Sequence, residues 1–242
     1  MTTVETNLNH VRRQIAAACA AAGRSVQEVT LLAVSKTQPA AVVRAAHAAG
    51  QSAFGENYVQ EALAKMDELA DLPLQWHCIG PLQANKTRAV AERFDWAHAI
   101  DRLRIAERLS AQRPEHLPPL NVCIQVNVDG GPSKSGLPPH EALPLARAIA
   151  ALPRLRLRGL MAIPEPQPDD AAARAVFARV AATFAQVRAA LAAEAAPGQG
   201  ASADFDTLSM GMSADLAPAI AAGSTLVRVG TALFGARQRP LK

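Results

Sequence analysis

The amino-acid sequence predicts an α/β protein that folds as a single (β/α)8 barrel of the TIM type over residues 1–242, with one extra helix at the N-terminus. Three observations lead to this prediction. Strand-like apolar runs alternate with helical patterns, which is typical of parallel strands joined by helices. There are eight such runs in the sequence, the number that closes a barrel. A length of 242 residues suits one domain of this kind.

Each element follows from a local pattern. A first helix is predicted over 6–22, where Leu8, Val11 and Ile15 share one face and Gly23 is placed to end it. The predicted strands are 28–35, 51–54, 75–80, 95–100, 119–128, 155–163, 205–210 and 225–229. The predicted helices between them are 39–49, 57–70, 83–94, 101–112, 139–151, 169–194 and 214–222.

Residues at the ends of these helices support their bounds. Pro39 suits a first helical turn, Gly50 and Gly223 suit the positions after a helix, and Asp101 is predicted to cap the helix that follows it. A doubly wound open sheet is the alternative architecture. The first strand is not followed by the G-x-G-x-x-G pattern, which weakens a dinucleotide-binding version of that alternative.

Composition and charge argue against several classes of function. The net charge is +4, but the basic residues are dispersed, so no basic stripe indicates binding to nucleic acid. No apolar run approaches the roughly 18 residues of a membrane span, and the N-terminus lacks the apolar core of a signal peptide. We therefore expect a cytoplasmic protein. The three cysteines form no C-x-x-C pair and the six histidines show no paired spacing, so neither disulfides nor a metal site are expected.

Lys36 stands at the end of the first predicted strand, in the stretch LLAVSKTQPA. Lysine is almost never fully buried without a partner, so this side chain either reaches solvent or takes part in chemistry. Most basic residues of this chain are arginines, which are poor nucleophiles, and only five lysines are eligible for Schiff-base chemistry. Taken alone, Lys36 is best interpreted as a solvated lysine at a strand end.

The segments after the seventh and eighth predicted strands indicate an anion site. Barrel enzymes often bind phosphate at this position, with help from a helix N-terminus. SMGMSAD (209–215) offers hydroxyls, including that of Ser213, and backbone N–H groups at the start of the helix 214–222. VGTALFG (229–235) offers Gly230 for close backbone approach and then the hydroxyl of Thr231. The competing interpretation is that Ser213 only caps a helix and Gly230 only makes a turn.

A lysine opposite a phosphate site favours pyridoxal 5′-phosphate bound as an internal aldimine, with a phosphosugar aldolase as the rival. Partial burial would lower the pKa of the lysine and leave a reactive amine. Arg228 is predicted to point into the barrel mouth, because Val227 and Val229 face the other side of the strand. An arginine cannot accept a proton from the pyridine nitrogen, so the ring would stay neutral and would be a weaker electron sink. This argues against transamination and allows either racemisation or no turnover.

The sequence resembles the YggS/PROSC family of pyridoxal phosphate homeostasis proteins over essentially its whole length. The motifs that carry the resemblance are AVSKTQP (33–39), FGENYVQE (54–61), WHCIGPLQANK (76–86), KSG (134–136), GLMAIP (159–164), LSMGMSAD (208–215) and VRVGTALFGAR (227–237). The resemblance implies a barrel like the N-terminal domain of alanine racemase, without that enzyme's second, β-rich domain. Three departures are Gln38 in place of a second lysine, Pro81 in place of a histidine, and arginines in the C-terminal tail.

The resemblance also implies roles for individual residues. Lys36 would carry the aldimine and Arg228 would face the pyridine nitrogen. The remaining implied cofactor contacts are Ser213, Gly230 and Thr231 at the phosphate, with backbone help around Ser209 and Met210, and Asn57 and His77 as pocket lining. Lys134 would be a second amine near the site, able to receive or pass the cofactor.

The sequence favours a carrier over an enzyme. Two-base racemisation needs an acid or base on each face of the substrate, and only Lys36 is an evident one. Tyr58 is the single tyrosine and is interpreted as packing or a ring contact. We therefore expect a monomer that holds pyridoxal 5′-phosphate, delivers it to apo-enzymes and has little or no turnover. An amino-acid racemase is the alternative, a Schiff-base aldolase is less favoured, and a pure interaction module leaves the phosphate-site residues unexplained.

Overall fold

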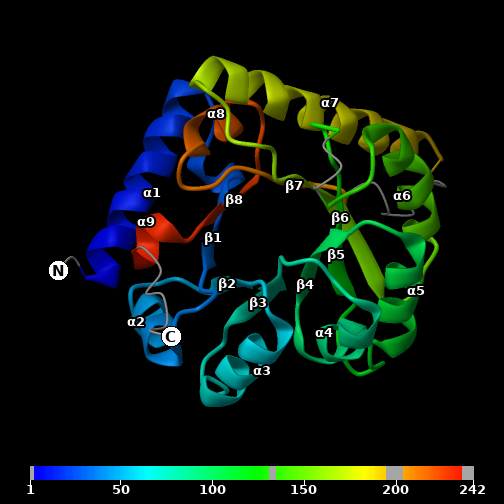
Figure 1. The fold of residues 1–242 in the computed structure, drawn as a ribbon, viewed down its shortest axis with the longest axis horizontal. Helices are drawn as coiled ribbons and strands as arrows, with labels where there is room; N and C mark the ends of the chain where they lie inside the picture. The colour runs from blue at the N-terminus through cyan, green and yellow to red at the C-terminus, as the bar shows by residue number, and fades with distance from the viewer. Residues whose placement is uncertain (1–2, 131–134, 195–203, 236–242) are drawn as a thin grey trace.

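The structure is a computed structural model, and it describes residues 3–130, 135–194 and 204–235. In these residues, eight parallel strands pair in chain order and close into a barrel (Figure 1). The last strand pairs with the first, with Leu32 opposite Arg228. The strands are β1 (Thr30–Val34), β2 (Ala53–Glu56), β3 (Gln75–Cys78), β4 (Trp96–Ile100), β5 (Leu120–Gln125), β6 (Leu155–Met161), β7 (Thr207–Ser209) and β8 (Leu226–Val229). The predicted barrel is confirmed.

Helices surround the barrel as predicted, with two corrections. They are α1 (Val4–Ala21), α2 (Ala40–Ala48), α3 (Val59–Glu68), α4 (Thr87–Arg93), α5 (Leu103–Gln112), α6 (Ala142–Ala150), α7 (Asp170–Glu194), α8 (Leu216–Ala221) and α9 (Thr231–Phe234), with short 3-10 turns η1 (Val26–Glu28), η2 (Ala84–Lys86) and η3 (Pro139–Glu141). Helix α9 was not predicted, because one turn is too short to show a period. Asp101 does not cap α5: the cap position is Arg102, whose guanidinium pairs with the Asp101 carboxylate at 2.8 Å.

The extra N-terminal helix covers the place where β8 pairs with β1 and closes the barrel. Figure 1 shows α1 alongside α8 and α9, the last two helices of the described residues. Its apolar stripe is buried there, including Leu8, Val11 and Ile15. After the helix, the Arg24 guanidinium donates to the carbonyls of Ile220 and Ser224, both at 2.8 Å. The two ends of the sequence are thereby joined beside β1 and β8, the strands that carry the site.

Two small apolar clusters lie apart from the main core between strands and helices. One comprises Leu32, Ala53, Ile79 and Leu226, and the other comprises Trp96, Ala99, Cys123 and Met161. Because strand residues alternate between faces, these side chains fill the interior of the barrel. Polar side chains lie there as well, including His77, His98 and Arg228, each at most 4% exposed. The interior of the barrel is therefore packed. We call the buried polar side chains His77, His98 and Arg228 within it the polar seam.

Helix α7 is the one helix in the described part of the chain whose length and composition would allow it to cross a membrane. That observation is weak, because long helices that pack against a soluble core pass the same test. In this structure α7 packs against α6, α8 and β6. Val176, Phe177, Val180 and Val187 are buried in these contacts.

Candidate cofactor-binding site

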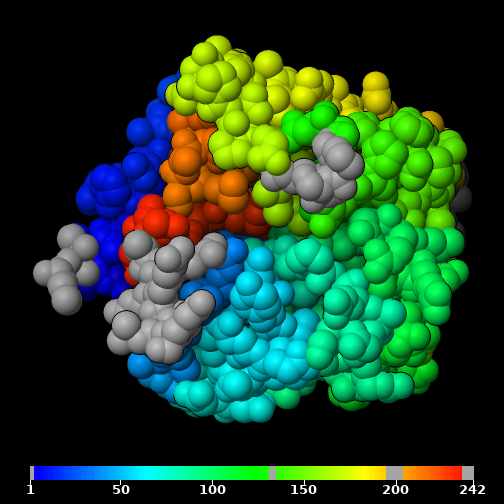
Figure 2. Space-filling view, viewed as in Figure 1, coloured from blue at the N-terminus to red at the C-terminus, as the bar shows by residue number. Residues whose placement is uncertain are grey.

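A cavity of about 290 Å³ opens at the carboxyl ends of the strands, the end at which barrel active sites lie. The side chains and backbone that line it come from the ends of six strands, β1, β2, β3, β6, β7 and β8. They are Val34, Lys36, Asn57, Ile79, Ile163, Met212, Ser213, Ala214, Arg228, Gly230 and Thr231. Figure 2, viewed as in Figure 1, shows the segments around β1 and β2 meeting those around β7, α8 and β8 at this face. The structure thus brings together six of the predicted site residues.

Lys36 projects from the first residues after β1 and is half-buried. The strand is extended by one further sheet bond, in which the Ser35 N–H donates to the Gly55 carbonyl at 3.0 Å. The chain then turns sharply at Thr37, whose φ is +64°. Lys36 therefore stands between the last sheet bond of β1 and this turn, and it lines the cavity.

The opposite wall presents the predicted anion-binding groups. The exposed side chain of Ser213 lies on the loop after β7, and that of Thr231 lies at the start of α9, after β8. The Ala232 N–H donates to the Ser213 hydroxyl at 3.5 Å and so links α9 to this loop. A Cβ at Gly230 would lie 3.2 Å from the Val34 carbonyl, so glycine allows a close approach to β1.

The helix at this wall differs from the prediction. Helix α8 begins at Leu216, and the Asp215 carboxylate accepts a hydrogen bond of 2.6 Å from the Met212 N–H. A carboxylate therefore stands before α8 and disfavours an anion at its N-terminus. Helix α9 begins at Thr231, on the cavity itself. The Leu233 and Phe234 N–H groups of this short helix donate to the Gly230 carbonyl, and the Ala232 N–H donates to the Ser213 hydroxyl. This wall therefore offers an anion the Ser213 and Thr231 hydroxyls rather than the helix donors expected from the segment 214–222.

Arg228 forms the inner wall of the cavity and is only 4% exposed. Its guanidinium donates to the Ser209 carbonyl at 2.7 Å, the Ser209 hydroxyl at 2.6 Å and the Ala162 carbonyl at 2.8 Å. Burial lowers the pKa of Arg228 to about 10, so the group is still a cation at neutral pH. It is fixed in place and can offer only donors to a ligand.

A chain of hydrogen bonds runs from Arg228 through the barrel interior. The Ser209 hydroxyl accepts from Arg228 and lies 3.0 Å from His98 Nδ1. His98 Nε2 lies 2.9 Å from His77 Nδ1, and His77 Nε2 lies 3.0 Å from Gln75 Oε1. Burial lowers the pKa of His77 to about 3 and that of His98 well below its usual value, so both rings are neutral. Because Gln75 Oε1 can only accept and both rings are neutral, each Nε2 is protonated and donates away from Arg228, and the Ser209 hydroxyl donates to His98 Nδ1.

Asn57 lies across the cavity, after β2. Its Oδ1 is buried and has no hydrogen-bond partner among the described residues. A Cβ at Gly80 would lie 2.4 Å from the Asn57 carbonyl oxygen, so glycine lets the end of β3 pack directly against this backbone. A buried acceptor without a partner costs free energy, and a donor on a bound ligand would remove that cost.

Four predicted residues lie elsewhere. His77 does not line this cavity, because it is on β3 two residues before the cavity residue Ile79 and faces the other end of the barrel. Met210 is fully buried in the main core, and its N–H donates to the Leu226 carbonyl. Ser209 reaches the site only through Arg228. Lys134 falls outside the described residues.

Sequence reasoning missed five residues of the cavity wall. They are Val34, Ile79, Ile163, Met212 and Ala214. Each stands within or beside a motif singled out in the sequence, but apolar residues at strand ends carry no signal that separates ligand contact from core packing. Among the described residues no group of three or more His, Cys, Asp or Glu side chains is arranged to hold a metal ion.

Comparison with known proteins places this barrel in a class. Residues 6–238 match the family model of the alanine racemase N-terminal domain. The alanine racemase from Corynebacterium glutamicum has the same fold, with a TM-score of 0.66 at 20% identity, and this chain covers 64% of that chain. The fold and the family model therefore define an alanine racemase-like barrel.

Two relatives give the family more narrowly. The chain is 57% identical over 237 residues to the pyridoxal phosphate homeostasis protein of Pseudomonas aeruginosa, covering 98% of this chain and 97% of that protein. It is 53% identical over 240 residues to the protein of the same name from Escherichia coli K12, covering 98% of each. The chain belongs to the family of the pyridoxal phosphate homeostasis proteins.

A solved relative of comparable length extends the comparison to structure. PipY of Synechococcus elongatus without pyridoxal phosphate gives a TM-score of 0.83 at 38% identity, covering 96% of this chain and all of that one. PipY with pyridoxal phosphate bound gives a TM-score of 0.77 at 40% identity, covering 91% of this chain.

Proposed function

We propose that this protein binds pyridoxal 5′-phosphate reversibly, holds it through a covalent bond to Lys36, and takes part in its intracellular homeostasis and delivery with little or no catalytic turnover. The observation that carries the proposal is one cavity that contains Lys36, the hydroxyls of Ser213 and Thr231, and the guanidinium of Arg228. The pyridoxal phosphate bound in the PipY structure supports the choice of ligand.

The residues of the cavity fit the chemical groups of this ligand. Ser213, Gly230 and Thr231 would hold the phosphate through hydroxyls and backbone N–H groups. Arg228 would donate to the pyridine nitrogen, and because it cannot accept a proton the ring would stay neutral. Asn57 Oδ1, which has no hydrogen-bond partner among the described residues, would accept a hydrogen bond from the ring hydroxyl of the ligand.

The covalent step is a condensation of an amine with an aldehyde. The Lys36 nitrogen would attack the aldehyde carbon, a C=N bond would form, and the aldehyde oxygen would leave as one molecule of water. The reverse reaction, hydrolysis, would release the ligand unchanged. A cavity open to water at the barrel mouth supports a reversible bond of this kind.

Low turnover is supported by the position of Tyr58. This tyrosine is 60% exposed at the start of α3 and does not belong to the cavity wall. A racemase needs a second acid or base opposite the lysine. In the described residues, the cavity wall offers Lys36 and Arg228 as its only ionisable side chains.

The proposal predicts that pyridoxal 5′-phosphate added to the purified protein forms a visible absorption band, and that borohydride reduction then attaches the ligand to Lys36. Peptide mapping by mass spectrometry would locate the adduct. Lys36→Ala should abolish both the band and the adduct, whereas Lys86→Ala, which changes a lysine outside the cavity wall, should leave both. An adduct retained at full yield by Lys36→Ala would refute the assignment of the lysine.

Turnover is tested separately. Incubation of the loaded protein with L-alanine or L-serine, followed by chiral analysis, should give no more D-isomer than free pyridoxal 5′-phosphate gives. Robust formation of the D-isomer would instead establish the racemase alternative.

We extend the proposal to a monomeric, cytoplasmic protein that hands its ligand to apo-enzymes, with Lys134 as a second amine on the transfer route. Light scattering after size exclusion would measure the mass, expected near the 25.4 kDa of one chain. Transfer is measured as recovery of activity by an apo-enzyme mixed with the loaded protein, and Lys134→Ala should slow that recovery.

A further inference from the structure

A buried cluster of charged side chains lies directly beneath Lys36 and takes no part in lining the cavity. Its centre is Lys65 on α3, which is 5% exposed. The Lys65 ammonium donates to a carboxylate oxygen of Glu56 at 2.7 Å, to a carboxylate oxygen of Glu61 at 2.6 Å and to the Ser35 carbonyl at 2.7 Å. All three donors of the ammonium are therefore used by named partners.

The cluster holds the residue before Lys36 by two bonds. The Ser35 carbonyl accepts from Lys65, and the Ser35 hydroxyl donates to Glu56 at 2.6 Å. Both Ser35 and Glu56 are at most 1% exposed. Ser35 can therefore neither rotate nor shift without breaking charge-assisted hydrogen bonds inside the protein.

The same cluster holds the residue after Lys36. The Thr37 N–H donates to Glu61 at 2.5 Å, on the carboxylate oxygen that also accepts from Lys65. Thr37 has a φ of +64°, a left-handed conformation that is strained for a β-branched residue. Such a conformation persists only where neighbouring groups hold it, and such residues cluster at functional sites.

The cost of this arrangement argues for a specific role. Burial of ions is unfavourable unless their geometry and hydrogen bonds are complete. Burial raises the pKa of Glu56, against the opposing effect of Lys65, and one Glu56 oxygen has no partner among the described residues. An apolar contact between β2 and α3 would avoid that cost. What an apolar contact cannot do is bind the backbone on both sides of Lys36.

We propose that Lys65, Glu56 and Glu61 form a positioning cluster that fixes Ser35 and Thr37 and so sets the approach of the Lys36 amine to a carbonyl carbon in the cavity. This inference rests on the proposed function. It assigns a role to the two glutamates of the FGENYVQE motif, which the binding of the ligand leaves unexplained.

The test separates positioning of Lys36 from formation of the pocket. Pyridoxamine 5′-phosphate carries an amine where pyridoxal 5′-phosphate carries the aldehyde, so it binds without a C=N bond to lysine. Glu61→Ala should lower the rate and the extent of borohydride-trapped adduct at Lys36 about tenfold, because misplacement of a reacting group has effects of this order or larger. The dissociation constant for pyridoxamine 5′-phosphate, measured by calorimetry, should change by less than about twofold.

Two variants serve as controls. Glu61→Gln keeps a side-chain oxygen that can accept from the Thr37 N–H, so it should retain most of the adduct formation. Glu68→Ala removes an exposed carboxylate from the same helix and should behave as the unchanged protein. Lys65→Met should show the largest loss, and thermal unfolding of each variant would establish that it is folded.

Two results would overturn the inference. One is unchanged adduct formation in Glu61→Ala. The other is a parallel loss of adduct and of pyridoxamine 5′-phosphate binding, which would mean that the cluster only holds the fold of the pocket. Failure of the proposed function would look different, because the unchanged protein would then form no adduct at Lys36.

Discussion

The barrel has a cavity at each end, and the two differ in how their polar groups are used. The upper cavity, at the carboxyl ends of the strands, contains Lys36, Asn57 and Arg228. The lower cavity is larger, about 360 Å³, and lies at the amino ends of the strands. Its lining comprises Glu28, Thr30, Gln75, His77, Trp96, Arg158, Asp206, Thr207, Thr225 and Leu226.

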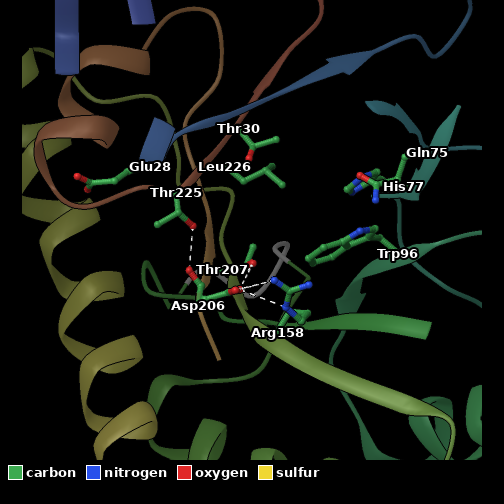
Figure 3. Close-up of a pocket in the computed structure, with 10 residues that line it drawn as sticks. All are labelled: Glu28, Thr30, Gln75, His77, Trp96, Arg158, Asp206, Thr207, Thr225 and Leu226. Atoms are coloured by element: carbon green, nitrogen blue, oxygen red, sulfur yellow. Dashed lines mark hydrogen bonds and ion pairs between the residues drawn. The ribbon is translucent and has the colours of Figure 1, made fainter. Parts of the chain in front are cut away.

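Most polar groups of the lower cavity are bonded to one another. Figure 3 shows the Arg158 guanidinium on the Asp206 carboxylate, at 2.6 Å and 2.8 Å, with Thr207 and Thr225 also bonded to Asp206. The guanidinium carbon of Arg158 stands 4.8 Å from the centre of the Trp96 ring. Trp96 Nε1 is the exception, a buried donor with no partner in the described part of the chain.

This difference between the two cavities shows that the size of a cavity alone does not identify a binding site. In the lower cavity the chain satisfies its own charges, so a ligand would have to break existing bonds. The upper cavity is lined by Lys36, by the hydroxyls of Ser213 and Thr231, and by the buried Arg228 guanidinium. It also contains Asn57, whose Oδ1 has no hydrogen-bond partner among the described residues. This agrees with the general division of labour in barrels, in which one face serves chemistry and the other serves stability.

Removal of the upper hydroxyls tests this division with the largest expected effect. The double variant Ser213→Ala, Thr231→Ala should weaken binding of pyridoxal 5′-phosphate roughly 30- to 100-fold, or about 2–3 kcal/mol, because each hydroxyl would donate to a charged phosphate. Fluorescence titration would measure the affinity. Both side chains are exposed, so the free energy of unfolding should change little.

A matched measurement uses pyridoxal without its phosphate. The double variant should bind pyridoxal as the unchanged protein does, since the lost bonds are to the phosphate. An equal loss of affinity for both ligands would show that these two hydroxyls do not form the anion site.

The lower cavity should give the reverse pattern. Asp206→Ala removes the partner of the partly buried Arg158 and the acceptor of Thr207. We expect the free energy of unfolding to fall by about 1–2 kcal/mol, a modest value because the Asp206 carboxylate is half-exposed. Urea denaturation would measure it. Affinity for pyridoxal 5′-phosphate should stay within about twofold, and a large loss would contradict the division between the two ends.

The sequence was sufficient for the barrel because its signals are local. The apolar run of β1 and the position of Gly23 after α1 require no knowledge of distant contacts. Some strands were predicted to extend too far. The predicted strand 119–128 is an example, because β5 ends at Gln125. Sheet pairing decides where a strand ends, and the apolar run continues past it.

The site was only partly predictable, because its geometry depends on which face of a strand each residue occupies and on how deep in the barrel it lies. Lys36, Arg228, Gly230 and Thr231 follow from their positions at strand ends. His77 was predicted to line the same cavity, yet it lies two residues before Ile79 on β3, one layer deeper in the barrel. The positioning role of Lys65 could not be predicted, since it depends on a turn at Thr37 whose φ no motif indicates.

The polar seam between the two cavities gives the smallest expected effect, when the contribution of one histidine over one pH unit is measured. His77 has a pKa near 3 in the folded protein, and that of His98 is also depressed, against about 6.5 when unfolded. Between these values the unfolded chain binds more protons, so stability rises with pH and is lost as pH falls from about 6.5 towards 3. The expected slope is about 1 kcal/mol per pH unit for each histidine.

His98→Asn isolates this contribution. The variant loses one neutral ring and its bonds to Ser209 and His77, so its stability should be lower at every pH. The dependence of its unfolding free energy on pH, between pH 6 and pH 5, should nevertheless be smaller by about 1 kcal/mol per pH unit, the contribution of one histidine. If His98→Asn kept the full slope, the acid sensitivity would arise outside the seam, and the two ends of the barrel would not be joined by neutral histidines.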